Sequence, residues 1–169
     1  MKRLTVLRHA KSRSDEESVV DFDRPLNERG WKAARRIGRE LRQRHMRFDL
    51  ALASPAARVR ETLDGLAEGY GEFTFPLRFE PWLYLADAAT LLDTVRSLPD
   101  DAEHVLLAGH NPGLQRLVLE LTADDEKGFR QRLAGKYPTG ALAAIALSDW
   151  ADVRGSGTIV ELIFPKELA

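Results

Sequence analysis

Short runs of Val, Leu, Ile and Phe alternate along this chain with longer stretches in which apolar residues recur at helical spacing. Such alternation is typical of strands separated by helices, and it predicts an α/β fold. Because single domains usually contain about 100–200 residues, we expect the 169 residues to form one domain, 1–169. Its expected architecture is a three-layer sandwich, with a mainly parallel central sheet flanked by helices.

The limits of these elements follow from the apolar periodicity and from the residues that interrupt it. The expected strands are 3–8, 49–53, 73–79, 104–108, 140–147 and 158–164. The expected helices are 28–46, 55–67, 88–98, a helix from the Pro112 turn to about 122, and 125–134. Asn27 is the expected N-cap of the first helix, and Ser54 is that of the second, with Pro55 at its first position. Pro165 is expected to end the ordered chain.

Composition excludes several classes of function. The chain has 26 acidic and 25 basic residues, so its overall charge attracts neither nucleic acid nor a membrane surface. The absence of cysteine excludes disulfides, thiolate metal sites and cysteine nucleophiles. The first apolar run is interrupted at Arg8, unlike that of a signal peptide, and no run approaches the roughly 20 apolar residues of a membrane span. We therefore expect a cytoplasmic protein.

Three of the expected strands end at an abrupt turn with a cationic or ionisable residue. Arg8 and His9 follow the first strand, Arg58 follows the turn at Ser54, and His110 lies in a Gly-His-Asn-Pro turn. If right-handed crossovers make these strands parallel, their carboxyl ends share the sheet edge at which open α/β sheets bind ligands. We therefore expect these two arginines and two histidines to meet in one crevice.

This combination of residues predicts a phosphate site that contains its own nucleophile. Two guanidiniums can hold the oxygens of a phosphoryl group by bidentate hydrogen bonds, and a neutral His9 can attack its phosphorus. Nearby arginines lower a histidine pKa and so favour the neutral form, while His110 could donate to the transferring oxygens. Taken singly, Arg58 is more simply a surface helix residue and His110 a capping or packing residue. Their joint occurrence at matching strand ends favours the phosphate site.

A metal site is the competing interpretation of two histidines, because two imidazoles and a carboxylate can bind a divalent ion. The arginines would repel a cation from the same crevice. The sequence has neither a His-x-x-x-His motif nor a clustered set of carboxylates. His45 and His104 are expected to be structural or exposed, so no metal is predicted.

Four motifs, in order, resemble those of the histidine phosphatase superfamily and, within it, the small SixA-type phosphohistidine phosphatases. They are Leu7–Ser12 (LRHAKS), Arg24–Gly30 (RPLNERG), Ser54–Thr62 (SPAARVRET) and Gly109–Pro112 (GHNP). Ala10 departs from the pattern, since many members of the superfamily have glycine there. The resemblance covers nearly the whole chain and implies a phosphoglycerate mutase-like fold. The lack of a large insertion between the strands is similar to the SixA branch rather than to the phosphoglycerate mutases.

By this resemblance, His9 would be the nucleophile that becomes phosphohistidine, Arg8 and Arg58 the phosphate clamp, and His110 the remaining residue of the site. The resemblance implies no metal and no organic cofactor. It does not identify the acid that protonates the leaving group. The carboxylates considered for that role are Glu80, Asp15, Asp21 and Asp87.

The sequence leaves three functions open. The favoured one is a phosphatase that works through phosphorylated His9, with phosphohistidine in a protein as substrate. A second keeps this chemistry but acts on a small phosphomonoester, such as a sugar phosphate or a nucleotide. A third is a module that binds phosphorylated partners through Arg8 and Arg58 without turnover.

Overall fold

A six-stranded mixed sheet forms the centre of the computed structural model, which describes residues 1–14 and 19–168. Across the sheet the strand order is β3-β2-β4-β1-β5-β6. The strands are β1 (Lys2–Arg8), β2 (Leu50–Ala53), β3 (Leu77–Phe79), β4 (His104–Gly109), β5 (Leu142–Leu147) and β6 (Thr158–Ile163). The first four strands are parallel to one another, whereas β5 is antiparallel to both β1 and β6. The predicted, mainly parallel sheet is confirmed.

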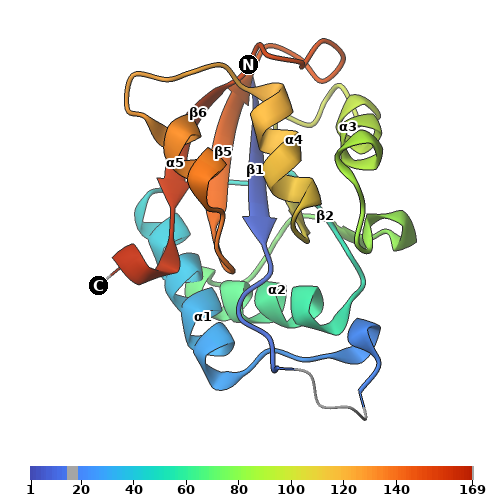
Figure 1. The fold of residues 1–169 in the computed structure, drawn as a ribbon, viewed down its shortest axis with the longest axis vertical. Coiled ribbons are helices and arrows are strands. Elements are labelled where there is room, and N and C mark those ends of the chain that lie inside the picture. Colours follow the sequence, from blue (N-terminus) through green and yellow to red (C-terminus); the bar gives the residue numbers. More distant parts are fainter. Residues whose placement is uncertain (15–18, 169) are drawn as a thin grey trace.

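Helices cover both faces of this sheet and complete the three layers (Figure 1). One face packs against α1 (Glu28–Gln43) and α2 (Ala57–Tyr70), and the other against α3 (Ala88–Arg96), α4 (Gly113–Leu121) and α5 (Phe129–Gly135). The alternation of strand side chains explains this division, since Leu4 and Val6 of β1 join the α3–α4 core while Leu7 joins the α1–α2 core.

The start of α1 braces the segment that follows β1. The Asn27 side chain accepts a hydrogen bond from the Gly30 amide at 2.8 Å, so the predicted N-cap is confirmed. The Asn27 amide in turn donates to the Lys11 carbonyl at 3.0 Å. A Cβ at Gly30 would lie 2.1 Å from that same carbonyl oxygen. Gly30 therefore allows the close approach that holds the chain just after His9.

The predicted start of the second helix is wrong. The helix α2 begins at Ala57 rather than at Pro55, and its N-cap position, Ala56, makes no capping side-chain bond. Ser54 lies before the helix and its hydroxyl contacts His110 instead, as described below. A serine followed by proline gives the same local pattern in either case, so sequence periodicity alone could not separate them.

Several other limits also differ from the prediction. The helix α1 ends at Gln43 instead of 46, α2 ends at Tyr70 instead of 67, β5 begins at Leu142 instead of 140, and α5 begins at Phe129 instead of 125. The strand expected at 73–79 is only β3, because Phe73 and Phe75 pack with Tyr70 and Phe48 in an aromatic group instead of pairing with β2. The chain does not lose its order at Pro165. This proline occupies the first turn of a 3-10 helix, Pro165–Glu167, where its missing amide hydrogen needs no partner.

Two short 3-10 turns lie beyond the predicted elements, and both border the carboxyl edge of the sheet. They are η1 (Asp21–Asp23), between β1 and α1, and η2 (Pro81–Leu83), between β3 and α3. The edge-to-face contact of Phe22 with Tyr84, at 5.1 Å between ring centroids, joins them. No helix within the described residues is long and apolar enough to cross a membrane.

Candidate active site

The three strand ends singled out in the sequence meet at one edge of the sheet. The His9 amide donates to the Gly109 carbonyl, and the Ser54 amide donates to the Ala108 carbonyl, each at 3.1 Å. The rings of His9 and His110 lie 5.5 Å apart, and Arg58 Nη2 is 3.4 Å from His110 Nδ1. The predicted meeting of His9, Arg58 and His110 is therefore observed.

His9 is held as a neutral imidazole with one nitrogen available for attack. Its Nδ1 lies 2.7 Å from the Ala10 carbonyl oxygen, which can only accept, so Nδ1 carries the proton and Nε2 carries the lone pair. The side chain is 7% exposed. Burial, together with the positive charges of Arg58 and Arg8, lowers the pKa of His9 to about 4. At neutral pH, His9 is thus an unprotonated base beside two cations.

His110 is also neutral, and a buried serine orients it. Its Nε2 lies 2.7 Å from Ser54 Oγ. Burial and the charge of Arg58 lower the pKa of His110 to about 3. A hydroxyl can either donate or accept, so Ser54 supports both neutral tautomers of this imidazole. Arg58 Nη2 can only donate, so in this structure Nδ1 accepts from it and Nε2 donates to Ser54. If an anion takes Arg58 Nη2, Ser54 can donate to Nε2 instead, and Nδ1 can then carry a proton toward that anion.

The two arginines are positioned by main-chain groups. Arg8 Nη1 donates to the Tyr137 carbonyl at 2.9 Å, and the Tyr137 hydroxyl donates to the Val6 carbonyl at 2.5 Å. Arg58 is 2% exposed and lies in the first turn of α2. The Nε groups of Arg8 and Arg58 are buried without a hydrogen-bond partner within the described residues. Buried donors of this kind provide unused binding capacity for an oxyanion.

Thr62 ties His9 to Arg58. Its hydroxyl accepts from the Ala10 amide at 2.9 Å and donates to the Arg58 carbonyl at 2.6 Å. The neighbouring Glu61 carboxylate accepts from the Leu26 amide at 2.8 Å. Thr62 and Glu61 thus bind α2 to the chain after His9 and to the segment before α1. These contacts explain why the motif that begins at Ser54 extends beyond Arg58.

Asp21, from η1, contacts the outer side of the arginine clamp. Its carbonyl oxygen and its Oδ2 accept from the two terminal nitrogens of Arg58, at 2.7 and 3.1 Å. Tyr84 also donates to Oδ2, and Arg24 donates to Oδ1. These hydrogen bonds, from Tyr84 first and then from Arg24, hold the pKa of Asp21 well below its usual range. Asp21 is therefore an ionised carboxylate and not a proton donor at neutral pH.

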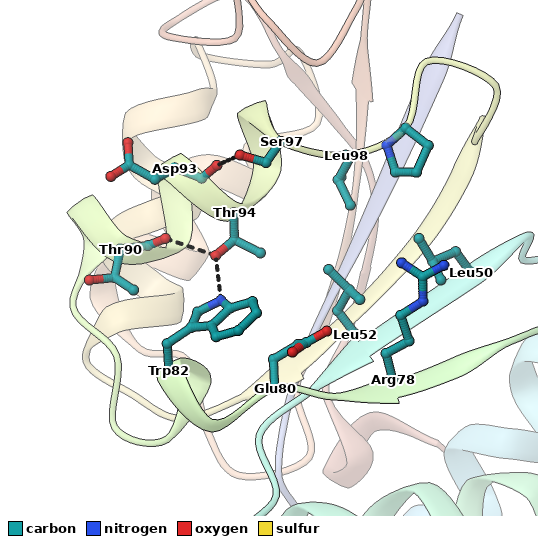
Figure 2. Close-up of a pocket in the computed structure, with 11 residues that line it drawn as sticks. Leu50, Leu52, Arg78, Glu80, Trp82, Thr90, Asp93, Thr94, Ser97 and Leu98 are labelled. Carbon is teal, nitrogen blue, oxygen red and sulfur yellow. Dashed lines mark hydrogen bonds between the residues drawn. The ribbon is translucent and has the colours of Figure 1, made fainter.

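The other carboxylates considered as the acid lie elsewhere. Glu80 follows β3 and points into a groove of about 460 Å³ beside Trp82 (Figure 2). Within the described part of the chain, its side chain makes no hydrogen bond or ion pair with the histidines or the clamp. Asp87 caps α3 by accepting from the Thr90 amide at 2.9 Å, and Asp15 lies outside the described residues.

Sequence reasoning missed Ser54, Thr62, Tyr84 and Tyr137. The sequence predicts Ser54 as a helix cap and not as a partner of His110. Thr62 ends the motif Ser54–Thr62, but the sequence indicates no role for it. The other two act over long separations in the chain, through the Tyr84 hydroxyl and the Tyr137 carbonyl. No spacing rule connects such residues to the strand ends. The described residues contain no group of three or more His, Asp or Glu arranged to hold a metal ion.

Comparisons with known proteins decide the family. The profile of the histidine phosphatase superfamily (branch 1) matches residues 4–83. An uncharacterized protein of Mycobacterium tuberculosis, Rv1276c, is 30% identical over 164 residues, which are 95% of this chain and 100% of the relative. The chain belongs to the histidine phosphatase superfamily. Membership in this superfamily confirms the predicted enzyme class, a phosphatase.

Solved structures place the chain more finely within the histidine phosphatase superfamily. SixA from Agrobacterium tumefaciens, assigned as a phosphohistidine phosphatase, superimposes with a TM-score of 0.82 and 27% identity, covering 97% of this chain and 98% of that protein. SixA from Nakamurella multipartitia, with the same assignment, gives a TM-score of 0.83 and 29% identity, covering 97% and 96%. The predicted phosphoglycerate mutase-like fold and the resemblance to SixA-type members are confirmed.

Proposed function

We propose that this protein is a phosphohistidine phosphatase that transfers the phosphoryl group of its substrate to His9 and then hydrolyses it. One observation carries the proposal. His9 is buried and neutral, its Nδ1 is fixed on the Ala10 carbonyl, and its unprotonated Nε2 lies in the field of Arg8 and Arg58. A nucleophile in this state needs no separate base to activate it.

In the first step, Nε2 of His9 attacks phosphorus while the bond from phosphorus to the leaving group breaks. The electron pair of the broken bond stays with the leaving group, and the phosphoryl group becomes attached to His9. Arg58 and Arg8 neutralise charge on the transferring oxygens, using donors that include their unpartnered Nε groups. His110 donates from Nδ1 to one of these oxygens when the Ser54 hydroxyl donates to its Nε2.

In the second step, water attacks the phosphorus of phosphorylated His9. The new bond joins phosphorus to the water oxygen, and the bond from phosphorus to Nε2 breaks. Orthophosphate leaves together with a proton from the water, and His9 returns to its neutral form. The low pKa of His9 assists this step, because a weakly basic imidazole is a good leaving group.

The substrate class follows from what the clamp contains. An alkoxide leaving from a phosphomonoester needs a proton, and Asp21, the carboxylate in contact with Arg58, is ionised. The distant nitrogen of phosphohistidine can take a proton from water, and the imidazole then leaves as a neutral molecule without an acid from the enzyme. The likeness to proteins assigned as phosphohistidine phosphatases also supports this class, and a phosphorylated protein as the substrate.

The proposal is tested with a phosphorylated histidine-containing phosphotransfer protein, and a sugar phosphate, whose alkoxide leaving group needs a proton, serves as the small ester. We expect phosphate release from the protein, abolished in His9→Ala and retained in His104→Ala, whose histidine lies at the opposite end of β4. We also expect kcat/KM to favour the phosphoprotein by at least about a hundredfold, or ~2.7 kcal/mol. A preference for the small ester would favour the second function. Tight binding without turnover would favour the binding module.

A further inference from the structure

Asp21 occupies the side of Arg58 that the two terminal nitrogens of its guanidinium form. Both terminal nitrogens of this guanidinium donate to Asp21, one to its carbonyl oxygen and one to its carboxylate. Such a pair of nitrogens can bind an oxyanion by two parallel hydrogen bonds. Arg58 is buried, whereas the Asp21 side chain is 46% exposed, so Asp21 covers the clamp from the solvent side.

The carboxylate is held there by two further donors. Arg24 Nη2 bonds Oδ1 at 2.9 Å, and the Tyr84 hydroxyl bonds the same Oδ2 that contacts Arg58. Tyr84 also packs edge-on against His110, at 5.5 Å between the ring centroids. Asp21 is therefore a fixed negative charge next to the groups that would receive the phosphoryl dianion. The two anions would repel each other if both remained on Arg58.

From these contacts we propose that Asp21 is a specificity-determining residue that competes with phosphate for Arg58. A phosphoryl group takes the terminal nitrogens of Arg58 only when Asp21 leaves them. Free orthophosphate and small esters can displace Asp21 only through the contacts that their phosphate group makes with Arg58. A larger substrate can add contacts elsewhere that favour the displaced position of η1.

The surroundings of η1 and η2 favour a protein as that larger substrate. Apart from Met1, the large hydrophobic residues that are exposed within the described part of the chain all lie beside these turns. They are Val19, Val20, Phe22, Trp82 and Leu85. Phe22 and Tyr84 join the two turns, so a protein surface resting on these side chains acts on the segments that carry Asp21 and its anchor. This identification of the occupant rests on the proposed phosphohistidine phosphatase function.

The test measures inorganic phosphate binding by the full chain at pH 7, by calorimetry. Asp21→Asn keeps the shape of the side chain and removes its charge, so we expect phosphate to bind at least about tenfold more tightly. Asp23→Asn is the matched control, because Asp23 lies exposed on the same turn without a bond to Arg58, and we expect a change of less than about twofold. Tyr84→Phe removes one anchor of Asp21, and its affinity should lie between those of the wild type and Asp21→Asn.

Unchanged or weaker phosphate binding by Asp21→Asn would overturn the proposal, because it would mean that Asp21 orients Arg58 and stays in place when phosphate binds. Turnover supplies the second measurement. In Asp21→Asn, we expect KM for p-nitrophenyl phosphate to fall and the preference for the phosphoprotein to narrow. Phosphate binding requires no turnover, so this proposal can succeed even if phosphohistidine proves not to be the substrate.

Discussion

Two regions of the molecule lie beside β2, and they differ in how deeply their charged side chains are buried. The histidine cluster (Arg8, His9, Ser54, Arg58 and His110) lies at the carboxyl ends of β1, β2 and β4. The Trp82 groove lies beside Leu50 and Leu52 of β2, and it is lined by Arg78 of β3 and by Glu80, which follows β3 (Figure 2). The groove has an open volume of about 460 Å³, whereas in the cluster Asp21 bonds to the terminal nitrogens of Arg58.

The difference supports the proposed site at the cluster, because Arg58 and both histidines there are buried while the charged groups of the open groove are not. Arg58 and both histidines are at most 7% exposed, and they form hydrogen bonds with Ser54, Thr62 and Asp21. Burying such groups is unfavourable unless partners compensate, so these supports indicate a functional demand. Arg78 at the groove is exposed and is not subject to that demand.

The largest contrast is expected between the arginines of the two regions. Arg58→Lys keeps a positive charge but loses the planar pair of donors, so kcat/KM for the phosphoprotein should fall by about a hundredfold or more. The matched change in the groove, Arg78→Lys, should alter kcat/KM by less than about twofold. Steady-state kinetics on both variants measures the contrast. Equal losses of kcat/KM would contradict the assignment of catalysis to the histidine cluster alone.

The next contrast concerns protonation. A histidine loses its neutral form as the pH falls through its pKa, so with a pKa of about 4 His9 should remain about 90% neutral at pH 5. An ordinary histidine with a pKa near 6.5 would be only about 3% neutral, roughly thirtyfold less. Imidazole ¹⁵N shifts, assigned with His9→Ala and followed from pH 8 to pH 4, measure this directly. A midpoint for His9 above pH 6 would contradict the electrostatic description of the cluster.

A smaller effect is expected for the residue that orients His110. Ser54→Ala removes the hydroxyl that can pair with Nε2 in either tautomer of His110, so the imidazole loses its orienting partner and kcat should fall about tenfold. Ser97→Ala, in the groove, removes a hydroxyl that bonds only main-chain carbonyl oxygen, and its kcat should not change. Rapid kinetics with the phosphoprotein compares the two variants. An unchanged kcat in Ser54→Ala would leave Ser54 as a packing residue only.

The smallest effect is expected for the groove aromatic in reactions with small substrates. Trp82 is exposed, and its indole nitrogen makes one bond, of 3.3 Å, to Thr94. Trp82→Ala should change the free energy of unfolding by about 0.5 kcal/mol or less. Turnover of p-nitrophenyl phosphate should change by less than about twofold. Urea denaturation and the same ester assay check both values, and a large loss of ester turnover would extend the active site into the groove.

Much of the fold was predictable because it depends on local pattern. Asn27 shows its cap in sequence, and the apolar runs that became β1, β2 and β4 placed Arg8, His9, Arg58 and His110 at one sheet edge. What stayed hidden depends on contacts between distant segments. Nothing local distinguishes Ser54 as a histidine partner from Ser54 as a cap, or links Asp21 to Tyr84, 63 residues away.

The most direct test of the account is to trap the phosphoryl group on the enzyme. Wild-type protein is mixed briefly with a phosphorylated phosphotransfer protein, quenched in base, and analysed by mass spectrometry of its peptides. The account predicts an acid-labile, base-stable phosphate on the peptide that contains His9, present in His104→Ala and absent in His9→Ala. Phosphate release without any phosphorylated His9, or with the phosphate on another residue, would contradict it.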